Sequence, residues 1–285
     1  MAGTLYVVAT PIGNLDDLSV RALKTLRSVA WIACEDTRRA RKLLTRHGIE
    51  ARTISCHRFN EQERVEEVLP ILRRGNSVAL VSDGGTPGIS DPGSILIRSA
   101  ALEGIAVVPI PGPSAVAALL SASGIPADRF VFDGFLPSRA GERRRRLREL
   151  GRETRTVVVF EAPHRIRRTL EDMATILRDR PLVLGREMTK RHESIHRGDA
   201  ACLREVLGPG EVKGEITIAF PGTTGTEPGV KDEAGLRIVR AWRVALRAAD
   251  GDSRQALRLA ARALGMKRPV LYRLLAEMQE TGAAE

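Results

Sequence analysis

Short runs of apolar residues, many of them β-branched, alternate along the chain with stretches in which apolar residues recur at helical spacing. The short runs predict buried strands, and the longer stretches predict amphipathic helices. Strands are expected at Thr4–Ala9, Ser77–Ser82, Ile105–Ile110, Phe130–Asp133, Thr156–Glu161, Pro181–Gly185 and Glu215–Phe220. Helices are expected at Leu18–Val29, Glu61–Arg73, Ser94–Glu103, Ala140–Leu150 and Arg165–Leu177. This alternation is typical of the α/β fold class, and its two successive sets predict two tandem α/β domains.

Two breaks in the pattern divide the chain. Ser121–Pro126 ends a helical pattern with small residues and a glycine and then leads into proline, as a short hinge would. Pro221–Gly229 has almost no apolar residues and several turn formers, which predicts a linker. We therefore expect an N-terminal α/β domain at 1–120, a second α/β domain at 121–224 and a small helical domain at 230–285.

The last domain is expected to contain three helices, at Glu233–Ala249, Ser253–Leu264 and Pro269–Met278. A glycine after the second helix suits a C-cap, and a proline suits the start of the third. The pair could form a helix-turn-helix whose second helix carries Lys267, Arg268 and Arg273. A packing appendage or a dimerisation element fits the same spacing equally well.

Composition narrows the range of partners and of cellular locations. The 285 residues carry a formal net charge of +10, and the pI is near 10.3, which favours a polyanionic partner. Charge alone does not distinguish RNA from an acidic small molecule. The first residues lack a basic leader, and no apolar run approaches the ~20 residues that span a bilayer, so we expect a cytoplasmic protein without membrane contact. The cysteines, Cys34, Cys56 and Cys202, are too scattered to suggest a disulfide framework or a metal site.

Glycine- and proline-rich turns follow three of the expected strands, at Ala9–Asn14, Val81–Gly93 and Pro111–Ala115. In the second turn, Asp91 is placed to cap the next helix. The turns contain neither GxGxxG nor the lysine of a phosphate-binding loop, which disfavours a dinucleotide site and a nucleoside triphosphatase. In a parallel sheet such turns converge at the carboxyl edge, where α/β proteins bind ligands.

These three turns resemble the signature loops of the tetrapyrrole-methylase superfamily. Further strings resemble one of its branches, the ribosomal RNA small-subunit methyltransferases I, which methylate the 2′-hydroxyl of a cytidine in 16S ribosomal RNA. They are Cys34–Arg38, Arg41–Leu44, Val159–Arg165, Arg186–Lys190 and Gly214–Ile216, and they extend in order over nearly the whole chain.

The resemblance implies S-adenosylmethionine bound between the two α/β domains, a homodimer, and methyl transfer to a ribose 2′-hydroxyl in the decoding region. The RNA partner would be free small-subunit ribosomal RNA or the assembled small subunit. Carried over by matching position, the cofactor-binding residues are Pro11, Gly84, Gly85, Thr86, Ile89, Ser90, Ser114, Ala115, Phe160 and Glu161.

Methyl transfer mainly requires that the attacking oxygen be aligned with the methyl group, because a sulfonium methyl group is already activated. A base or cation could still assist loss of the hydroxyl proton. The candidates are Glu161, His164 and Lys190, followed by Glu35, Asp36 and Glu187. Two basic clusters could bind RNA phosphates, or could simply be solvated helix faces; their members are Arg38, Arg39, Arg41, Lys42, Arg143, Arg144, Arg145 and Arg146.

Three other functions are compatible with parts of the sequence. A methylase of small tetrapyrrole precursors would share the fold, although Gly85-Thr-Pro87 departs from the Gly-Asp-Pro loop of those enzymes. A ribosome-assembly factor that binds RNA without turnover is a second alternative, which the intact glycine turns disfavour. His192–His196 matches the HExxH zinc pattern, which works only on a helix, and we expect no metal there.

Overall fold

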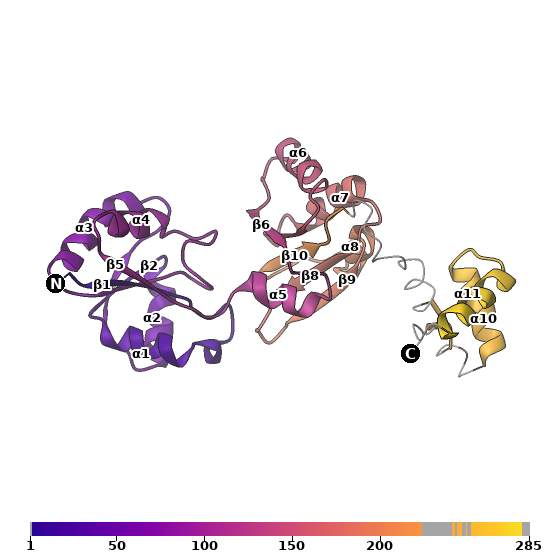
Figure 1. The fold of residues 1–285 in the computed structure, drawn as a ribbon, viewed down its shortest axis with the longest axis horizontal. Coiled ribbons are helices and arrows are strands. Elements are labelled where there is room, and N and C mark those ends of the chain that lie inside the picture. Colours follow the sequence, from indigo (N-terminus) through magenta and orange to yellow (C-terminus); the bar gives the residue numbers. More distant parts are fainter. Residues whose placement is uncertain (1, 224–240, 243, 247–248, 250–251, 281–285) are drawn as a thin grey trace. The chain divides into compact units, whose positions relative to one another are not determined.

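The computed structural model describes residues 2–223, 241–242, 244–246, 249 and 252–280. The chain forms two compact units, Met1–Thr223 and Thr224–Glu285. The first unit contains two five-stranded sheets, and the second is helical (Figure 1).

The first sheet is entirely parallel, with the strand order β3-β2-β4-β1-β5. Its strands are β1 (Thr4–Val8), β2 (Trp31–Cys34), β3 (Arg52–Ser55), β4 (Val78–Val81) and β5 (Ala106–Ile110). Buried side chains of α1 (Val20–Ser28) and α2 (Thr37–Arg46) pack on one face, and those of α3 (Glu61–Arg73) and α4 (Ser94–Leu102) pack on the other (Figure 1). A short 3-10 helix, η1 (Leu15–Asp17), precedes α1. The turns after β1, β4 and β5 therefore meet at one edge.

The second sheet is mixed, with the strand order β6-β7-β10-β8-β9. Its strands are β6 (Phe130–Phe135), β7 (Thr156–Glu161), β8 (Leu182–Arg186), β9 (Ser194–Gly198) and β10 (Ile216–Phe220). Only β6 and β7 pair in parallel, and β10 lies antiparallel to both of its neighbours. Side chains of α6 (Ala140–Leu150), α7 (Ile166–Leu177) and α8 (Ala200–Val206) form the core on one face.

The helix α5 (Ala115–Ser123) covers the opposite face of this second sheet. Leu119 and Leu120 pack with Val158 of β7 and Val183 of β8. Our expected boundary between residues 120 and 121 therefore falls inside a helix that belongs with the second sheet. We propose that the break comes before α5, because the buried leucines of this helix pack against the second sheet.

The expected strands and helices of the first unit are present, with ends shifted by a few residues. The sequence analysis did not identify β2, β3 and β9, nor the helices α2, α5 and α8. β3 and β9 have only four or five residues and include polar side chains, so they lack the apolar runs from which strands were predicted. β2 is apolar, but it follows the helical pattern that ends at Val29 so closely that the two were not separated.

In the second unit, α10 (Ser253–Ala263) and α11 (Arg268–Glu280) are joined by a four-residue turn containing Gly265. Ala256, Ala260 and Leu271 form the centre of its core. The helix expected at Glu233–Ala249 and the linker expected at Pro221–Gly229 lie largely outside the described residues. In the part of the chain that the structure describes, no helix is long and apolar enough to cross a membrane.

Candidate functional site

The turns that follow β1 and β4 are joined by backbone hydrogen bonds. The N–H of Thr10 donates to the carbonyl of Gly85 at 2.8 Å, and the N–H of Gly85 donates back to Thr10 at 2.9 Å. The hydroxyl of Thr10 also donates to the carbonyl of Ser82 at 3.1 Å. These bonds hold two glycine-containing turns together at the carboxyl edge of the first sheet.

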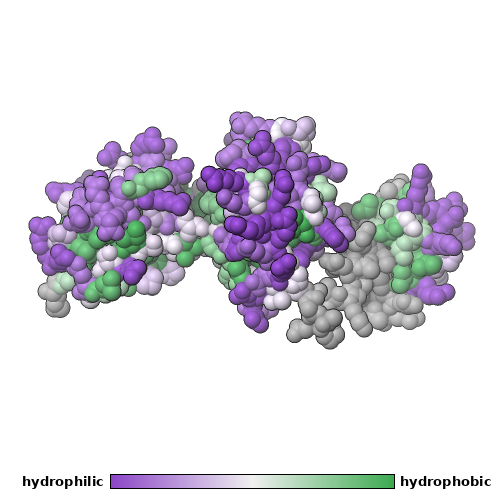
Figure 2. All heavy atoms as spheres, turned by 90° about the horizontal axis from the view of Figure 1, so that it is seen from above, coloured by the Kyte–Doolittle hydropathy of each residue, from purple (hydrophilic) through white to green (hydrophobic). Residues whose placement is uncertain are grey.

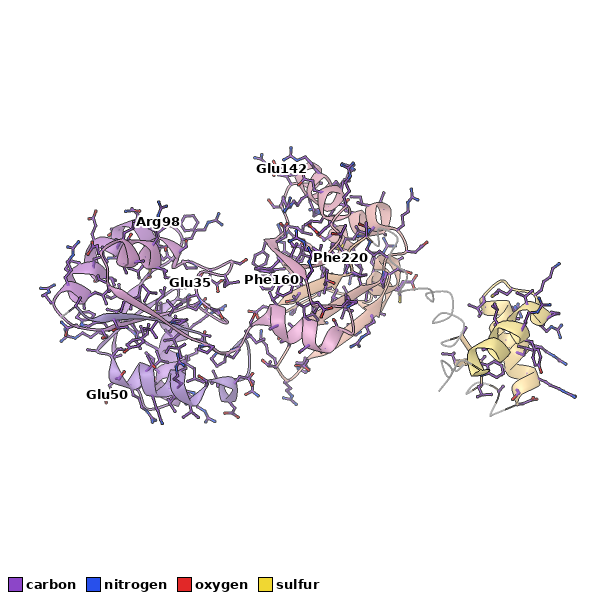
Figure 3. The ribbon with its side chains drawn as sticks, in the orientation of Figure 1. Glu35, Glu50, Arg98, Glu142, Phe160 and Phe220 are labelled. Carbon is purple, nitrogen blue, oxygen red and sulfur yellow. The ribbon has the colours of Figure 1, made fainter. Side chains whose placement is uncertain are left out.

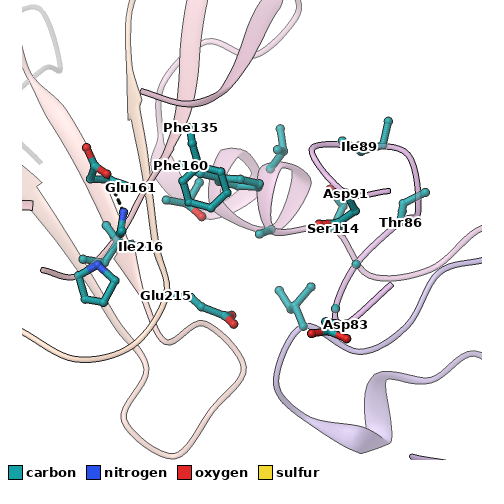
Figure 4. Close-up of a pocket in the computed structure, with 18 of the residues that line it drawn as sticks. Asp83, Thr86, Ile89, Asp91, Ser114, Phe135, Phe160, Glu161, Glu215 and Ile216 are labelled. Atoms are coloured by element: carbon teal, nitrogen blue, oxygen red, sulfur yellow. Dashed lines mark hydrogen bonds between the residues drawn. The ribbon is translucent and has the colours of Figure 1, made fainter. Parts of the chain in front are cut away.

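A cavity of about 350 Å³ lies against this edge (Figure 4). Both halves of the first unit contribute to it: the first sheet supplies the turns after β1 and β4, and the second supplies β7, β10 and the turns beside them. Its size is within the usual range for small-molecule sites. The lining residues are Ile12, Arg39, Asp83, Gly84, Gly85, Thr86, Ile89, Asp91, Ser114, Ala115, Val116, Phe135, Phe160, Glu161, Ala162, Pro163, Glu215, Ile216 and Thr217.

Most of the residues that sequence reasoning assigned to the cofactor line this cavity. They are Gly84, Gly85, Thr86, Ile89, Ser114, Ala115, Phe160 and Glu161. Pro11 and Ser90 are not among the lining side chains. Pro11 lies directly behind the wall, because its carbonyl oxygen would be 3.2 Å from a Cβ atom added to Gly84. Ser90 occupies a left-handed conformation, with φ of 65°, at the bend of the second turn.

The N-terminus of α5 also faces the cavity. Ser114, Ala115 and Val116 line the wall, and the first N–H groups of a helix have no acceptor within it. The Ser114 side chain does not cap the helix. This end therefore offers hydrogen-bond donors, and the partial positive charge of the helix, to a negatively charged group.

Three phenylalanines form the aromatic part of the site. The ring of Phe160, on β7, packs edge-on against Phe132 at 4.8 Å and against Phe135 at 5.5 Å between ring centroids. Phe135 and Phe160 line the cavity, and the side chain of Phe135 is half exposed. Sequence reasoning missed Phe135, because it belongs to none of the family strings and lies beyond a bulge in β6.

Carboxylates form the other notable part of the wall. Asp83, Asp91 and Glu215 line the cavity (Figure 4). Glu35, labelled in Figure 3, directly follows β2 and is close enough to influence the charge of Asp91. Burial, and then the neighbouring charge of Glu35, raises the pKa of Asp91 to about 6. Burial also raises the pKa values of Asp83 and Glu35. The site is therefore locally acidic although the whole chain is strongly basic.

The carboxylate of Glu161 is buried, and both of its oxygens have hydrogen-bond or ion-pair partners. Oε1 accepts from the N–H of Ala162 at 2.7 Å and pairs with Arg165 at 2.5 Å, and Oε2 accepts from the hydroxyl of Thr169 at 2.6 Å. These bonds fix the turn between β7 and α7. Glu161 is thus placed to hold this wall of the cavity in position.

The other candidate catalytic residues are farther from the cavity. His164 is exposed on the turn after β7 and does not line the wall. Lys190 is ion-paired with Glu187 at 2.8 Å and with Glu215 at 3.3 Å, so it reaches the site only through Glu215. Asp36 caps α2 by accepting from the N–H of Arg38 at 2.8 Å.

The two basic clusters differ in exposure. In α2, the side chains of Arg38, Arg39, Arg41 and Lys42 are all exposed, and Arg39 also lines the cavity while pairing with Asp83 at 3.4 Å. In α6, Arg143 is buried and pairs with Asp172 at 2.7 Å, so our interpretation of Arg143 as a phosphate-binding residue is wrong.

The remaining arginines of α6 do not form one uniform cationic face. Arg144 also pairs with Asp172, and Arg146 pairs with Asp133 and with Glu149. Arg145 is exposed, on a helix whose outer surface is strongly hydrophilic (Figure 2).

The HExxH string does not lie on a helix. Its last three residues, Ser194–His196, belong to strand β9. On a strand, side chains alternate between faces, so the spacing does not bring both histidines and the glutamate together as it does on a helix. Among the described residues, no group of His, Cys, Asp and Glu is arranged to hold a metal ion.

Residues 4–203 match the family model of Tetrapyrrole (Corrin/Porphyrin) Methylases. Near full-length relatives carry the name Ribosomal RNA small subunit methyltransferase I. The one from Pseudomonas aeruginosa is 42% identical over 281 residues, 98% of each chain. The one from Escherichia coli O157:H7 is 42% identical over 280 residues, 97% of this chain and 96% of its own.

A shorter relative of the same name, from Thermotoga maritima, is 45% identical over 223 residues, which is 77% of this chain and 99% of its own. Solved structures share the fold at low identity. The methyltransferase CobJ superposes with a TM-score of 0.60 at 18% identity, covering 80% of this chain and 98% of its own. Cobalt precorrin-4 methyltransferase superposes with a TM-score of 0.56 at 21% identity, covering 76% and 94%.

The family match covers most of the first unit, including the turns that form the wall of the cavity on the side of the first sheet. The relatives extend the similarity through both sheets and, in the longer ones, over nearly the whole chain. The chain belongs to the tetrapyrrole (corrin/porphyrin) methylase family, and it is a methyltransferase whose methyl donor is S-adenosylmethionine.

Proposed function

We propose that this protein methylates the 2′-hydroxyl of a cytidine ribose in the decoding region of small-subunit (16S) ribosomal RNA. The observation that carries the proposal is the 42% identity, over 98% of both chains, to a Ribosomal RNA small subunit methyltransferase I. The strongly basic composition supports an RNA substrate. We further propose that it acts in the cytoplasm as a homodimer.

The cavity has the properties that S-adenosylmethionine requires. The cofactor has a net positive charge, which suits a wall containing Asp83, Asp91 and Glu215. Its carboxylate suits the N-terminus of α5. We assign cofactor binding to the residues predicted from the sequence, with Pro11 and Ser90 supporting the wall, and we add Phe135, Asp83 and Asp91.

When bound, the cofactor supplies a methyl group on a positively charged sulfur, already activated for transfer to oxygen. The protein must hold the ribose hydroxyl in line, exclude water and accept a proton. Asp91 is the best-placed proton acceptor, because it lines the cavity and has a pKa of about 6. Glu161 positions the turn after β7, Lys190 positions Glu215, and His164 is exposed and accessible to RNA.

The exposed cations of α2 are the proposed phosphate contacts. Arg38, Arg39, Arg41 and Lys42 follow β2, whose carboxyl end lies at the same sheet edge as the cavity. A backbone held there would bring a nucleotide next to the cofactor. Arg144 and Arg145 on α6 are further candidates, because their side chains are exposed.

We assign catalysis to the two α/β domains and an accessory role to the C-terminal helices. The Thermotoga maritima relative supports this division, because 99% of its length matches only 77% of this chain. Lys267, Arg268 and Arg273 are exposed on or next to α11 and suit an additional contact with RNA.

The test is methyl transfer from labelled S-adenosylmethionine to three acceptors: small ribosomal subunits from a strain lacking this gene, naked small-subunit RNA, and a reduced tetrapyrrole precursor. We expect label in RNA, on a cytidine 2′-oxygen. Label in the tetrapyrrole alone, or in no acceptor despite cofactor binding, would contradict the proposal.

A further inference from the structure

Four residues other than glycine have a left-handed backbone in the described part of the chain. They are Ser90, Arg178, Glu187 and Thr189, with φ between 51° and 67°. This conformation is uncommon for residues with a side chain, and for a β-branched residue such as Thr189 it is strained. Strained residues persist where the surrounding contacts hold them, and they are frequent at functional sites.

Thr189 lies in the turn between β8 and β9, and this turn is fixed by its own hydrogen bonds. The N–H of Thr189 donates to the carboxylate of Glu193. The N–H of Lys190 donates to the carbonyl of Glu187 at 3.0 Å, and the N–H of Glu193 donates to the carbonyl of Lys190 at 3.0 Å. The position of the Thr189 side chain is therefore set by the second half of the first unit.

The hydroxyl of Thr189 is in contact with the first half. Its oxygen accepts a hydrogen bond at 3.0 Å from the backbone N–H of Asn14, in the turn after β1. The preceding residue, Gly13, lies directly against the same side chains. A Cβ atom added to Gly13 would be 2.4 Å from Cγ of Lys190 and 2.7 Å from Oγ1 of Thr189. The two turns thus touch at a point where only a glycine fits.

Both turns are connected to the wall of the cavity. Ile12, next to Gly13, lines it from the first half, and Glu215, which pairs with Lys190 at 3.3 Å, lines it from the second. Asp83 and Glu215 face each other across the cavity (Figure 4), and burial and, to a smaller extent, the charge of Glu215 raise the pKa of Asp83. Repulsion between these carboxylates opposes closure of the two walls, so the contact of the turns is needed to hold them together.

A second contact of the same kind adjoins the cavity. Ser90, in the turn after β4, is also left-handed, and a Cβ atom added to Gly134 of β6 would be 2.8 Å from its hydroxyl oxygen. The neighbouring residues Ile89 and Phe135 both line the cavity. At each of two places, therefore, a left-handed hydroxyl residue of one half lies against a glycine of the other.

We propose that Thr189 is a positioning residue for methyl transfer, whose hydroxyl holds the turn after β1 and thereby sets the distance between the two walls of the cavity. Transfer requires the methyl group and the attacking oxygen to be in line, so a small change in this distance slows the reaction. The inference does not depend on the proposed RNA substrate, because it concerns the cofactor cavity and holds for any acceptor.

A purely structural role is the competing explanation, and the backbone argues against it. A glycine at position 189 would adopt a φ of 67° without strain, so a residue needed only for the shape of the turn would be better as glycine. Threonine differs from glycine here by the hydroxyl that Asn14 contacts. The side chain therefore serves the contact between the halves rather than the turn itself.

The first test compares three substitutions of Thr189. Thr189→Val keeps the shape and removes the acceptor, so the dissociation constant for S-adenosylmethionine should rise about fivefold and kcat should fall about tenfold, with the KM for small subunits nearly unchanged. Thr189→Ser keeps the hydroxyl and should restore both values. Thr189→Gly should unfold at a higher temperature than Thr189→Val and still transfer slowly, because it relieves the strain without replacing the hydroxyl.

Two matched pairs of variants control for strain and for volume. Arg178→Gly relieves the same strain at an exposed residue between α7 and β8 and should leave cofactor affinity and kcat unaltered. Gly13→Ala pushes the two turns apart and should weaken cofactor binding as Thr189→Val does. Gly141→Ala, on α6, adds its methyl group in open space and should have no effect.

Calorimetric titration with S-adenosylmethionine and steady-state kinetics with small subunits give the readouts. Wild-type affinity and rate in Thr189→Val overturn the inference, as do losses in the three Thr189 variants that simply follow their unfolding temperatures. If the wild-type enzyme methylates no RNA, the proposed function is removed, and the cofactor affinities of the same variants still decide the role of Thr189.

Discussion

Oε1 of Glu61, the first residue of α3, accepts a hydrogen bond from the backbone N–H of Ile95 in α4 at 2.6 Å. The same oxygen accepts from Gly93 at 3.0 Å and from Leu96 at 3.2 Å, and the Glu61 side chain is buried. A glutamate distant in sequence therefore caps the helix that follows the cavity turn. The cap leaves Asp91, which we expected to perform this task, free to line the cavity.

Replacement of Glu61 by alanine should lower the free energy of unfolding by about 2–4 kcal/mol, because three backbone N–H groups, two of them buried, lose a charged acceptor. The affinity for S-adenosylmethionine should fall as well, since the turn at residues 83–93 loses its anchor. Chemical denaturation and calorimetric titration measure the two effects. Glu63→Ala is the matched control, because the Glu63 side chain is 71% exposed in the same helical turn; equal effects of the two substitutions would refute the capping role.

The pH dependence of methyl transfer should report the ionisation of Asp91. Burial and Glu35 raise its pKa to about 6, so the rate at saturating substrates should fall as the pH drops through about 6, where Asp91 gains a proton. Asp91→Asn should lower kcat by about 100-fold and abolish this limb of the profile. A variant that keeps the wild-type rate and profile would exclude Asp91 as the proton acceptor.

The raised pKa of Asp91 also affects stability: it lowers the free energy of unfolding as the pH rises, whereas the rate of methyl transfer increases. The unfolded chain loses the Asp91 proton near pH 4, and the folded protein loses it near pH 6, so the fold favours the protonated form. The contribution of Asp91 to stability therefore decreases between about pH 4 and pH 6 and stays low above that range. Asp91→Asn should raise the Tm relative to the wild type at pH 8 and leave little difference at pH 4, as scanning calorimetry at both values can check.

Arg143 should stabilise the fold and Arg41 should bind RNA, although both lie in arginine-rich helices. Arg143→Ala leaves Asp172 without its buried partner and should cost about 3–5 kcal/mol of stability, with little effect on the RNA affinity of the folded fraction. Arg41→Ala, at an exposed position, should leave the Tm unchanged and reduce the salt dependence of RNA binding. Thermal unfolding and filter binding over a range of salt concentrations separate the two; a reversal of these effects would contradict our placement of the RNA.

Truncation after Thr223 should leave the affinity for S-adenosylmethionine unchanged, because all residues that line the cavity belong to the first unit. Affinity for small subunits should decrease if the exposed cations of α11 contact RNA. Calorimetric titration of the truncated protein with the cofactor is the deciding measurement. A loss of cofactor affinity in a folded truncated protein would show that the C-terminal unit takes part in the site.

The sequence predicted most of the strands and eight of the residues that line the cavity, because both depend on local patterns. Apolar runs mark the buried strands, and glycine-rich turns follow them. The short strand β3 has no such pattern and lies at the edge of the first sheet, paired with β2. The mixed order of the second sheet likewise depends on β10, which inserts between β7 and β8 from a distant part of the chain.

The chemistry of single side chains was harder to predict, because it depends on partners far away in sequence. Nothing near Arg143 in the chain reveals Asp172, and nothing near Asp91 reveals Glu61 or Glu35. Residue type and spacing thus locate the site, whereas tertiary contacts decide what each residue does.

The most direct test of the account is the state of one ribose in cells. A 2′-O-methyl group prevents the neighbouring phosphodiester from alkaline cleavage, since the 2′-oxygen no longer attacks the phosphorus. Small-subunit RNA from cells with the gene should show one protected cytidine in the decoding region. RNA from cells lacking the gene should be cleaved at that position. The wild-type protein should restore protection, and Asp91→Asn should not. Identical cleavage with and without the gene would contradict the account.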